Sequence, residues 1–427
     1  MIDKINLANT EFNQWKNRSF QEIQLLFKNL ADILDEQKNT YANIITTEMN
    51  KPISQALSEV EKSAMMTRFY TNIDANVLAP EHIQTDFNIS QVHHTPLGVI
   101  LGVMPWNFPF WQVLRFAVPT ILAGNTVIVK HASICTQSGD AIEETFLKAG
   151  FPEGVFQHLK VGHQDIETIL KHPAVQGVSL TGSDLAGSSV ASIAGREIKK
   201  SVLELGGSDA FIVLEDADLE QAAEVGALAR LQNCGQTCVA AKRFIIHHNI
   251  ANAFLELFTK AYQKYQPSDP LNPNTILSGM ARKDLADELE QQYQKAITNG
   301  AEIIIPLERL SDKEFKPGLI LVKKENPILA EELFGPLGMV MIAQTDDEAL
   351  DLANDIPFGL GNSVWTKNQN KALDFALKLN SGTVAINSMT KSDPRLPFGG
   401  AKKSGYGTEL SALALKEFTY PKTIVGN

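Results

Sequence analysis

The sequence predicts an α/β protein built on a doubly wound, mainly parallel sheet, and two observations support this prediction. From Pro96 onward, short apolar runs alternate with longer stretches whose apolar residues have helical spacing. A second series of the same kind begins after Gly206-Gly207 with Ala210 to Leu214 and continues to about residue 387. Strands and helices that alternate at this pitch are typical of parallel sheets, in which ligands bind at the carboxyl ends of the strands.

The segment before Pro96 is expected to be mostly helical. Residues 11–76 are free of glycine, contain only Pro52 as a helix breaker, and place apolar residues such as Ile23 and Phe27 at helical spacing. We expect two or three amphipathic helices here. Residues 85–98 alternate polar and apolar side chains, which favours an exposed hairpin.

The alternating region itself can be divided into elements. The apolar runs predict strands at Gly98 to Met104, Thr126 to Lys130, Val155 to Val161, Val175 to Leu180 and Lys199 to Leu203. The stretches between them predict helices at 110–122, 134–149, 163–171 and 184–195. Further along, a helix-like run from Leu219 to Gln232 precedes an extended segment from Val239 to His247. Residues 397–407 hold four glycines, which indicates a loop shaped around a ligand or another backbone, and Thr419 to Val425 predicts a last strand.

Composition narrows the class of protein. A chain of 427 residues with 44% hydrophobic and 20% charged residues suggests about two or three globular domains. The net charge of −11, without a basic run, argues against a nucleic-acid surface. No apolar segment approaches the roughly 20 residues that span a membrane, and no signal peptide is expected. Three cysteines are too few for a disulfide framework and fit a reducing compartment, so a cytoplasmic location is expected.

Three residues are candidates for catalysis. Cys238 follows Gly235-Gln-Thr and can be a nucleophile, or simply a small buried apolar residue. Glu204 lies at the end of an apolar strand, where burial would raise its pKa towards that of a general base. Asn107, in Pro105-Trp-Asn-Phe-Pro109, can donate its amide to an oxyanion, although a rigid turn packed by Trp106 is an equal alternative.

Two further stretches are candidates for ligand binding. Leu180-Thr-Gly-Ser183 ends a predicted strand and opens a helix, where backbone N–H groups can hold a phosphate. A helix cap by Ser183 is an equally good explanation. Glu332 lies in Glu331-Glu-Leu-Phe-Gly-Pro336, where the alternative is a solvated helix end. None of the nine histidines has the spacing of a metal site, so no metal is expected.

Together these stretches resemble the NAD(P)-dependent aldehyde dehydrogenase superfamily over nearly the whole chain. The motifs that carry the resemblance, in the family's order, are Pro105-Trp-Asn-Phe-Pro, Leu180-Thr-Gly-Ser, Leu203-Glu-Leu-Gly-Gly, Gly235-Gln-Thr-Cys, Glu332-Leu-Phe-Gly-Pro and Pro397-Phe-Gly-Gly. The resemblance implies that Cys238 attacks an aldehyde to give a thiohemiacetal, that Asn107 and the Cys238 N–H hold the oxyanion, and that Glu204 activates the water that hydrolyses the thioester.

The same resemblance implies the cofactor contacts. Glu332 would hold the nicotinamide ribose with Phe334 beside it, and Lys130 and Ser183 would contact the adenosine ribose and the pyrophosphate. The expected cofactor-binding set is completed by Trp106, Gly182 and Ser133.

The resemblance also implies the division of the chain. A Rossmann-like cofactor-binding domain would comprise residues 1–84, 99–205 and 391–413, and a catalytic domain residues 206–390. Residues 85–98 and 414–427 would form a small β element that joins subunits of a homodimer or homotetramer.

The subfamily it resembles is that of the shorter bacterial succinate-semialdehyde dehydrogenases. In that branch an Arg at the place of Arg115 and a Ser at the place of Ser392 bind the distal carboxylate of the substrate. The alternative for Arg115 is a surface or interdomain ion pair. Ser133 stands where relatives that prefer NAD often have a Glu, and Lys130 could pair with a 2′-phosphate. NADP is therefore the expected cofactor, with NAD accepted.

Several departures and alternatives remain at the level of sequence. Gln232 replaces a substrate Arg of another branch, Thr408 replaces a common Arg, and an N-terminal segment of the family is absent. Cys234 could form a redox pair with Cys238, or be packed in the core. The alternative activities are oxidation of glutarate semialdehyde or neutral aldehydes, transfer of the acyl group to coenzyme A, and a non-catalytic binding role.

Overall fold

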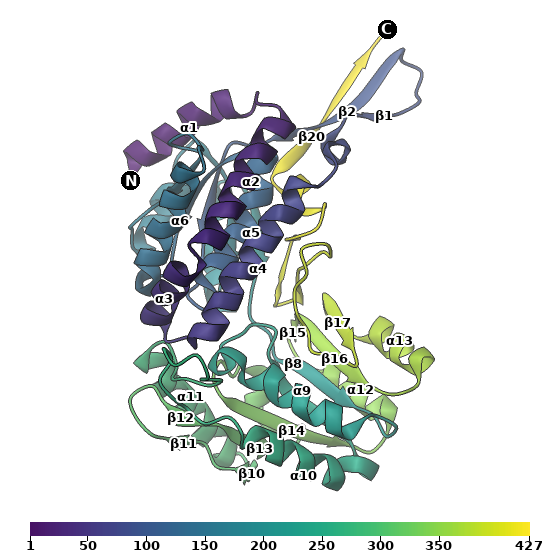
Figure 1. Cartoon of the computed structure of the whole chain (residues 1–427). Helices are drawn as coiled ribbons and strands as arrows, with labels where there is room; N and C mark the ends of the chain where they lie inside the picture. The colour runs from purple at the N-terminus through teal and green to yellow at the C-terminus, as the bar shows by residue number, and fades with distance from the viewer.

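The chain begins with a block of helices. The computed structural model describes all residues from 1 to 427. The block consists of α1 (Ile2–Trp15), α2 (Phe20–Glu36), α3 (Lys38–Met49) and α4 (Ile53–Thr71), with α2 and α4 lying side by side (Figure 1). Ser19 and Glu22 form a capping box that starts α2. Residues 11–76 were expected to form two or three helices, and they contain the three helices α2, α3 and α4, whereas α1 lies mostly before this segment. Asn50, at φ 65°, ends α3, and Pro52 immediately precedes α4.

The first sheet has six strands in the order β19-β7-β6-β3-β4-β5. The strands are β3 (Val99–Val103), β4 (Thr126–Lys130), β5 (Phe156–His158), β6 (Val175–Thr181), β7 (Lys200–Glu204) and β19 (Gly405–Tyr406). The connecting helices are α5 (Pro109–Leu122), α6 (Thr136–Lys148), α7 (Ile166–Lys171) and α8 (Asp184–Arg196). All neighbouring strands are parallel except β19, which pairs antiparallel with β7. The strand order reverses between β3 and β6, and such a switch point is where doubly wound sheets bind ligands.

The second sheet has seven strands in the order β10-β13-β14-β9-β8-β16-β17. They are β8 (Asp209–Val213), β9 (Ala241–His247), β10 (Glu302–Ile305), β13 (Gly318–Leu321), β14 (Leu337–Ala343), β16 (Gly361–Trp365) and β17 (Thr383–Ile386). Its helices are α9 (Leu219–Leu231), α10 (Ala251–Tyr262), α11 (Lys283–Thr298), α12 (Asp346–Asn354) and α13 (Gln369–Lys378). A core of 47 buried residues, centred on strands such as β9 and β14, fills this part. The predicted α/β fold is thus confirmed in both halves.

A slender β arm projects from the body. It consists of β1 (Glu81–His82), β2 (Ile89–Pro96) and β20 (Thr419–Gly426), which form a three-stranded sheet with β2 in the middle (Figure 1). The expected hairpin therefore starts slightly earlier than residue 85. Its side chains are largely exposed, including Ile89 and Ile424.

The glycine-rich segment near the C-terminus connects the two sheets. Its strand β18 (Ala401–Lys402) pairs with β15 (Phe358–Gly359), which leads into β16 of the second sheet, while β19 extends the first sheet. The segment then returns to the first half through the short helix α14 (Ala414–Glu417) and enters β20. The site between the sheets is thereby bounded by chain from three separate parts of the sequence. No helix in the structure has the length and apolar character required to cross a membrane.

Candidate active site at the junction of the two sheets

A pocket of about 400 Å³ opens at the carboxyl ends of β3, β6 and β7. Its walls come from loops that follow these strands, from α11, and from the segments around residues 238 and 331–334. The pocket is lined by eight of the sequence-predicted site residues: Trp106, Asn107, Gly182, Ser183, Glu204, Cys238, Glu332 and Phe334. The structure therefore brings together the thiol, the strand-end carboxylate and the side-chain amide that the sequence singled out separately.

The loop that carries Cys238 has an unusual backbone. After α9 ends at Leu231, Asn233 and Cys234 adopt left-handed conformations, with φ of 54° and 55°, and Gly235 follows at φ 72°. A Cβ on Gly235 would lie 2.3 Å from the carbonyl oxygen of Gly335, so only glycine fits there. Asn233 and Cys234, which are not glycine, store strain in this region of φ that the surroundings must hold.

Arg230 holds this loop from below. Its side chain is fully buried, and it donates hydrogen bonds to the carbonyl oxygens of Leu337, Leu333 and Gly335 and, at 3.4 Å, to that of Gly235. One guanidinium thus joins the loop of the thiol to the segment that carries Glu332. Nothing in the local sequence distinguished Arg230 from a surface residue of a helix, and this contact was not predicted.

Cys238 is partly exposed, whereas Cys234 and Cys135 are buried. Burial raises the pKa of the Cys238 thiol to about 11, while the nearby charges of Arg115 and Lys242 act in the opposite direction. Cys234 belongs to the core of the second sheet, and burial raises its pKa to about 12. Cys234 is thus packed in the core, which is the second of the two roles considered for it.

Glu204 is 2% exposed, and neither of its carboxylate oxygens has a hydrogen-bond partner. Burial and the neighbouring carboxylate of Glu409 raise the pKa of Glu204 well above its usual value, and the Arg115 guanidinium partly offsets this. Glu409 itself is buried and paired with Arg115. An unpaired carboxyl group whose pKa is raised in this way is suited to exchange a proton with a ligand or water.

Asn107 is buried at the foot of the pocket. Its Nδ2 donates to the carbonyl oxygen of Gln236 at 3.2 Å, and its Oδ1 has no partner. The second N–H of the same amide remains available for a ligand. The rigid turn that was the alternative interpretation is also present, since Trp106 packs edge-on against Phe334 with ring centroids 5.7 Å apart.

The carboxylate of Glu332 lies at the other end of the pocket. Its Oε1 is 2.8 Å from the ammonium of Lys242 and accepts the N–H of Gly207 at 3.1 Å. Glu332 is thus held in place, unlike the side chain of a solvated helix end. Opposite it, the Ser183 side chain caps α8 through the N–H of Ala186, as the alternative for this residue predicted. The N–H of Leu185 is taken by the Asp184 side chain, and Gly182, Ser183 and Asp184 line the pocket.

Lys130 and Ser133 lie further along the carboxyl edge of the first sheet. Ser133 is exposed and lines a second hollow of about 550 Å³, together with residues that follow β5 such as Lys160. Lys130 ends β4 close by, and its ammonium makes no hydrogen bond or ion pair within the chain. The two hollows follow the same edge, as a dinucleotide that crosses the switch point requires.

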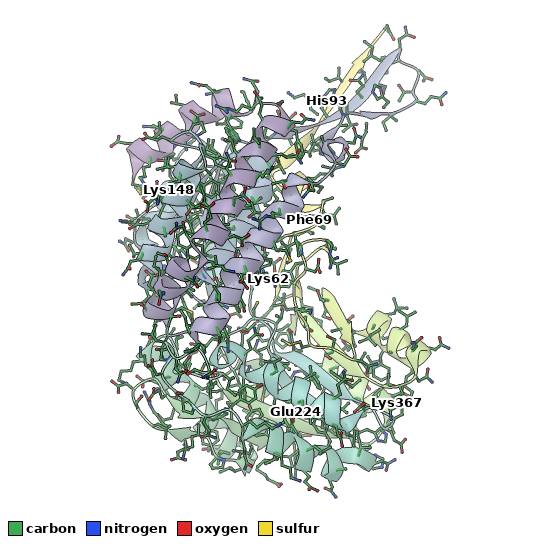
Figure 2. The ribbon with its side chains drawn as sticks, in the orientation of Figure 1. Lys62, Phe69, His93, Lys148, Glu224 and Lys367 are labelled. Carbon is green, nitrogen blue, oxygen red and sulfur yellow. The ribbon has the colours of Figure 1, made fainter.

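Arg115 and Ser392 lie outside both hollows. Arg115 is 2% exposed in α5 and forms an ion pair with Glu409, which is also buried. This pair differs from the surface or interdomain pair that was the alternative, because it lies in the interior and both residues belong to the segments assigned to cofactor binding. Its Nη2 group is buried without an acceptor. Ser392 accepts a hydrogen bond of 2.8 Å from Lys62, which extends from α4 (Figure 2) over the ring of Trp111. Burial and Arg115 lower the pKa of Lys62 to about 8.

Sequence reasoning missed most of the residues that support the site. They are Lys51, Glu59, Lys62, Arg230, Lys242 and Glu409. The signal that could have found Glu59 is a carboxylate on the apolar face of a predicted helix. For Lys242 it is a lysine inside an otherwise apolar strand, where an unpaired charge is costly. No group of three or more His, Cys, Asp or Glu side chains is arranged to hold a metal ion.

Comparison with known proteins agrees with this geometry. The model of the aldehyde dehydrogenase family matches residues 2–424. A probable succinate-semialdehyde dehydrogenase [NADP(+)] of Synechocystis sp. is 44% identical over 99% of this chain and 93% of its own length. A succinate-semialdehyde dehydrogenase [NADP(+)] of Deinococcus radiodurans is 40% identical over 98% of this chain and 89% of its own. Succinic semialdehyde dehydrogenase from Streptococcus pyogenes, solved with NADP+, superposes with a TM-score of 0.97 at 35% identity, covering 100% of this chain and 95% of that one.

Proposed function

The chain belongs to the aldehyde dehydrogenase family, and we propose that it oxidises succinic semialdehyde to succinate with NADP+. The observation that carries this proposal is the pocket in which Cys238, Glu204 and Asn107 meet at the switch point of the first sheet. A thiol, an unpaired carboxyl group and a free amide N–H are the groups that covalent oxidation of an aldehyde requires.

The first step assigned to this site is attack by Cys238. The thiol gives its proton to water, its sulfur forms a bond to the aldehyde carbon, and the π bond of the carbonyl breaks so that its oxygen becomes an oxyanion. The free N–H of Asn107 is suited to bind that oxygen, because the amide is buried and fixed by Gln236. Burial raises the pKa of the thiol to about 11 and so disfavours the thiolate. The positive charges of Arg115 and Lys242 act in the opposite direction and favour the thiolate.

When bound, NADP+ would supply the acceptor for the hydride that leaves this carbon. The chain fits such a group through Lys130, whose ammonium has no partner, and through Ser133, an exposed neutral residue beside it. A carboxylate at position 133 would repel a 2′-phosphate, whereas Ser133 does not. In the first pocket, Glu332 provides a carboxylate for a ribose hydroxyl, and the rings of Trp106 and Phe334 line the same pocket.

Hydrolysis of the thioester is assigned to Glu204. Its two oxygens have no partner in the chain, so the carboxylate can accept a proton from water. That water adds to the thioester carbonyl, the carbon–sulfur bond breaks, and Cys238 is regenerated as the acid leaves. Glu409 and Arg115 set the charge around Glu204 and thereby its pKa.

A substrate with a second carboxylate is supported by the cations near the pocket. The Nη2 of Arg115 has no acceptor, and Lys62 has only Ser392 as a hydrogen-bond partner. Lys62 forms no ion pair with a carboxylate, although Asp393 and Glu59 are close enough to act on its charge. We assign these three side chains to the distal carboxylate of succinic semialdehyde, so Arg115 would serve both Glu409 and the substrate.

The β arm supports assembly into a homodimer or homotetramer. It projects away from the body and exposes apolar side chains such as Ile89 and Ile424, which a neighbouring subunit would cover (Figure 1). The division of the chain into the cofactor-binding residues 1–84, 99–205 and 391–413, the catalytic residues 206–390 and this arm is part of the same proposal. The three free cysteines fit the expected reducing, cytoplasmic environment.

The test is the initial rate of NADPH formation from succinic semialdehyde. The wild-type rate should be abolished in Cys238→Ala and kept in Cys135→Ala, a matched thiol that lies outside the pocket lining. Butanal, which has the same carbon chain without the carboxylate, should react with a much higher KM. Equal kcat/KM values for the two aldehydes would overturn the assignment of the substrate but not that of the chemistry.

A further inference from the structure

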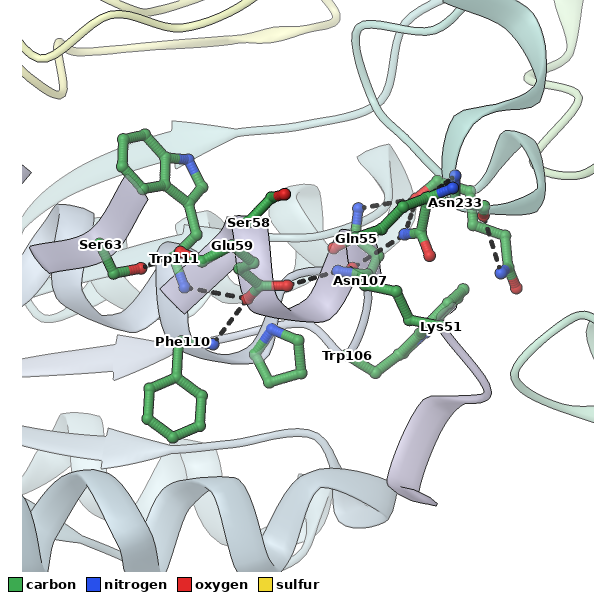
Figure 3. Close-up of polar contacts among 12 residues, drawn as sticks. Lys51, Gln55, Ser58, Glu59, Ser63, Trp106, Asn107, Phe110, Trp111 and Asn233 are labelled. Carbon is green, nitrogen blue, oxygen red and sulfur yellow. Dashed lines mark hydrogen bonds and ion pairs between the residues drawn. The ribbon is translucent and has the colours of Figure 1, made fainter. Parts of the chain in front are cut away.

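A buried ion pair lies beneath the loop that carries Asn107. Lys51, between α3 and α4, and Glu59, in α4, have side chains that are 0% and 1% exposed and in direct contact (Figure 3). Both come from the N-terminal helices, which contribute no residue to the lining of the catalytic pocket. A charged pair so far from water is expensive, so its partners indicate what it does.

The two side chains bind almost every residue of one short segment. Lys51 donates to the carbonyl oxygen of Asn107 at 2.8 Å, and its ammonium lies 3.8 Å from the ring centroid of Phe108. Oε1 of Glu59 accepts the N–H groups of Phe110 at 2.9 Å and Trp111 at 3.1 Å, at the start of α5. The carboxylate thus also satisfies N–H groups that a helix start leaves without partners.

The same carbonyl group is held from the opposite side by the loop of the nucleophile. Nδ2 of Asn233 donates to the oxygen of Asn107 at 2.9 Å, and the N–H of Asn233 donates to Oε1 of Gln55, in α4, at 2.8 Å (Figure 3). Asn107 is therefore clamped at its main chain between α4 and the loop that leads to Cys238. The side-chain amide of Asn107 makes one hydrogen bond within the chain, and its Oδ1 has no partner, so the amide still has groups that can bind a ligand.

The energetics favour a role in geometry over one in stability. Replacing a buried ion pair by apolar residues of similar volume is often neutral for folding. An apolar pair would fill this space, but it could not bind the carbonyl of Asn107 or the N–H groups of Phe110 and Trp111. The ammonium of Lys51 and both carboxylate oxygens of Glu59 have partners, and a buried pair satisfied in this way fixes one arrangement. A donor for an oxyanion must be placed to a fraction of an ångström.

We propose that Lys51 and Glu59 are positioning residues for catalysis, which hold the main chain of Asn107 so that its amide meets the oxyanion formed on Cys238. The inference rests on the proposed function in that it takes Asn107 as the oxyanion donor. It adds that the position of the Asn107 amide is set by residues of the N-terminal helical block.

The test uses a reaction of Cys238 that needs neither an aldehyde nor a cofactor. The thiolate attacks the carbonyl of p-nitrophenyl acetate, the ester C–O bond breaks, p-nitrophenolate leaves, and water hydrolyses the acetyl thioester. This reaction passes through an oxyanion. Alkylation of the same thiol by iodoacetamide displaces iodide and forms no oxyanion. The ratio of the two rates therefore isolates the contribution of the oxyanion site from the reactivity of the thiol.

In the full-length protein, Lys51→Met and Glu59→Gln should each lower the rate of ester acylation by roughly tenfold to a hundredfold, because an ångström of misplacement has effects of this size. Alkylation should stay within about twofold of wild type. In the Asn107→Ala background, either substitution should change acylation less than about twofold, since the group it positions is gone. Lys38→Met, which breaks an exposed ion pair with Glu61 on the same two helices, is the matched control and should leave both rates unchanged.

Two results would overturn the proposal. One is that the pair acts on the whole fold, which would be seen as an equal loss of acylation and alkylation. It would also be seen if the loss of acylation in Lys51→Met or Glu59→Gln multiplied with the loss in Asn107→Ala. The other is a wild-type acylation rate that Asn107→Ala does not change, because no oxyanion function would exist for the pair to serve. If Lys51→Met fails to fold, Glu59→Gln, which keeps volume and an acceptor, decides alone. These measurements use neither an aldehyde nor a cofactor, so they would remain informative even if the protein did not oxidise succinic semialdehyde.

Discussion

The ammonium of Lys242 lies 2.8 Å from Oε1 of Glu332 and also donates hydrogen bonds to the carbonyl oxygens of Thr237 and Cys238. One buried cation therefore connects the carboxylate assigned to the cofactor with the main chain of the proposed nucleophile. Its charge favours the thiolate of Cys238, whereas Glu332 disfavours it. A ligand that takes over the carboxylate of Glu332 would leave more of the charge of Lys242 to act on the thiol.

Lys242→Met is predicted to make Cys238 less reactive. Loss of a nearby positive charge should raise the thiol pKa above its value of about 11, so alkylation by iodoacetamide at pH 8 should slow by roughly threefold to tenfold. The measurement is the pH dependence of the alkylation rate. Lys264→Met, which breaks an exposed pair with Glu224, is the control. An unchanged profile would show that Lys242 only packs.

Glu409→Gln is predicted to lower the pKa of Glu204. Burial and the negative charge of Glu409 both raise that pKa, and neutralising Glu409 leaves Arg115 to stabilise the Glu204 carboxylate. If Glu204 must be ionised to activate water, kcat rises with pH as it loses its proton. The acidic limb of the profile should therefore move to lower pH in the variant. An unmoved limb, in a variant with wild-type circular dichroism, would count against Glu204 as the base.

Lys62→Met is predicted to affect acidic substrates only. Because the ammonium lies beside Ser392 and has no carboxylate partner, its loss should raise KM for succinic semialdehyde by about tenfold and leave butanal unaffected. In the wild type, the pKa of about 8 means that Lys62 is charged below pH 8 and loses its proton above it. KM for succinic semialdehyde should accordingly rise above pH 8, and that for butanal should not.

The control for Lys62 is Lys148→Met, because Lys148 is an exposed lysine on α6 (Figure 2) that pairs only with Glu144. It should change neither KM. If Lys62→Met raised KM equally for both aldehydes, Lys62 would contribute to packing and would not bind the substrate carboxylate.

Ser133→Glu is predicted to reverse the cofactor preference. The residue is exposed at the rim of the second hollow, so a carboxylate there meets water as well as ligand. It should repel the 2′-phosphate of NADP+ and raise its KM by about tenfold or more, while NAD+ is affected much less. Initial rates with both cofactors provide the comparison within a single variant. Equal effects on both would mean that the 2′-phosphate lies elsewhere.

The sequence was a good guide where chemistry and strand ends coincide. Cys238, Glu204 and Asn107 each follow a predicted element, so the topology of a parallel sheet brought them together as expected. The pairing of Arg115 with Glu409 could not be foreseen from spacing, since it joins α5 to a loop after β19. Glu59 and Lys51 likewise fall within an amphipathic pattern, and only packing showed which of its polar residues were buried. The spacing of apolar residues predicts which face of a helix is buried. It does not predict which residue a buried charged side chain will pair with, because that depends on tertiary contacts.

The same limit applies to the backbone of the nucleophile loop. Asn233 and Cys234 have left-handed φ values. Asn and Gly are the residue types that favour this region, so Asn233 and Gly235 were weak signals, but nothing in the sequence indicated it for Cys234. The loop takes this form because Arg230 binds the carbonyl oxygens of Gly235 and Gly335 in one place.

Gly235→Ala is predicted to destabilise the protein, and Gly300→Ala is its matched control. Both glycines have left-handed φ, at 72° and 88°, so alanine costs each of them about 1–2 kcal/mol in backbone conformation. A Cβ at 235 would also lie 2.3 Å from the carbonyl oxygen of Gly335, whereas one at 300 meets nothing within 4 Å. The clash has no flexible side chain to relieve it, so Gly235→Ala should cost about 1–3 kcal/mol more than Gly300→Ala in urea unfolding. Equal losses would mean that the segments around Gly235 and Gly335 can separate without cost, and the clamp by Arg230 would then be weaker than its hydrogen bonds imply.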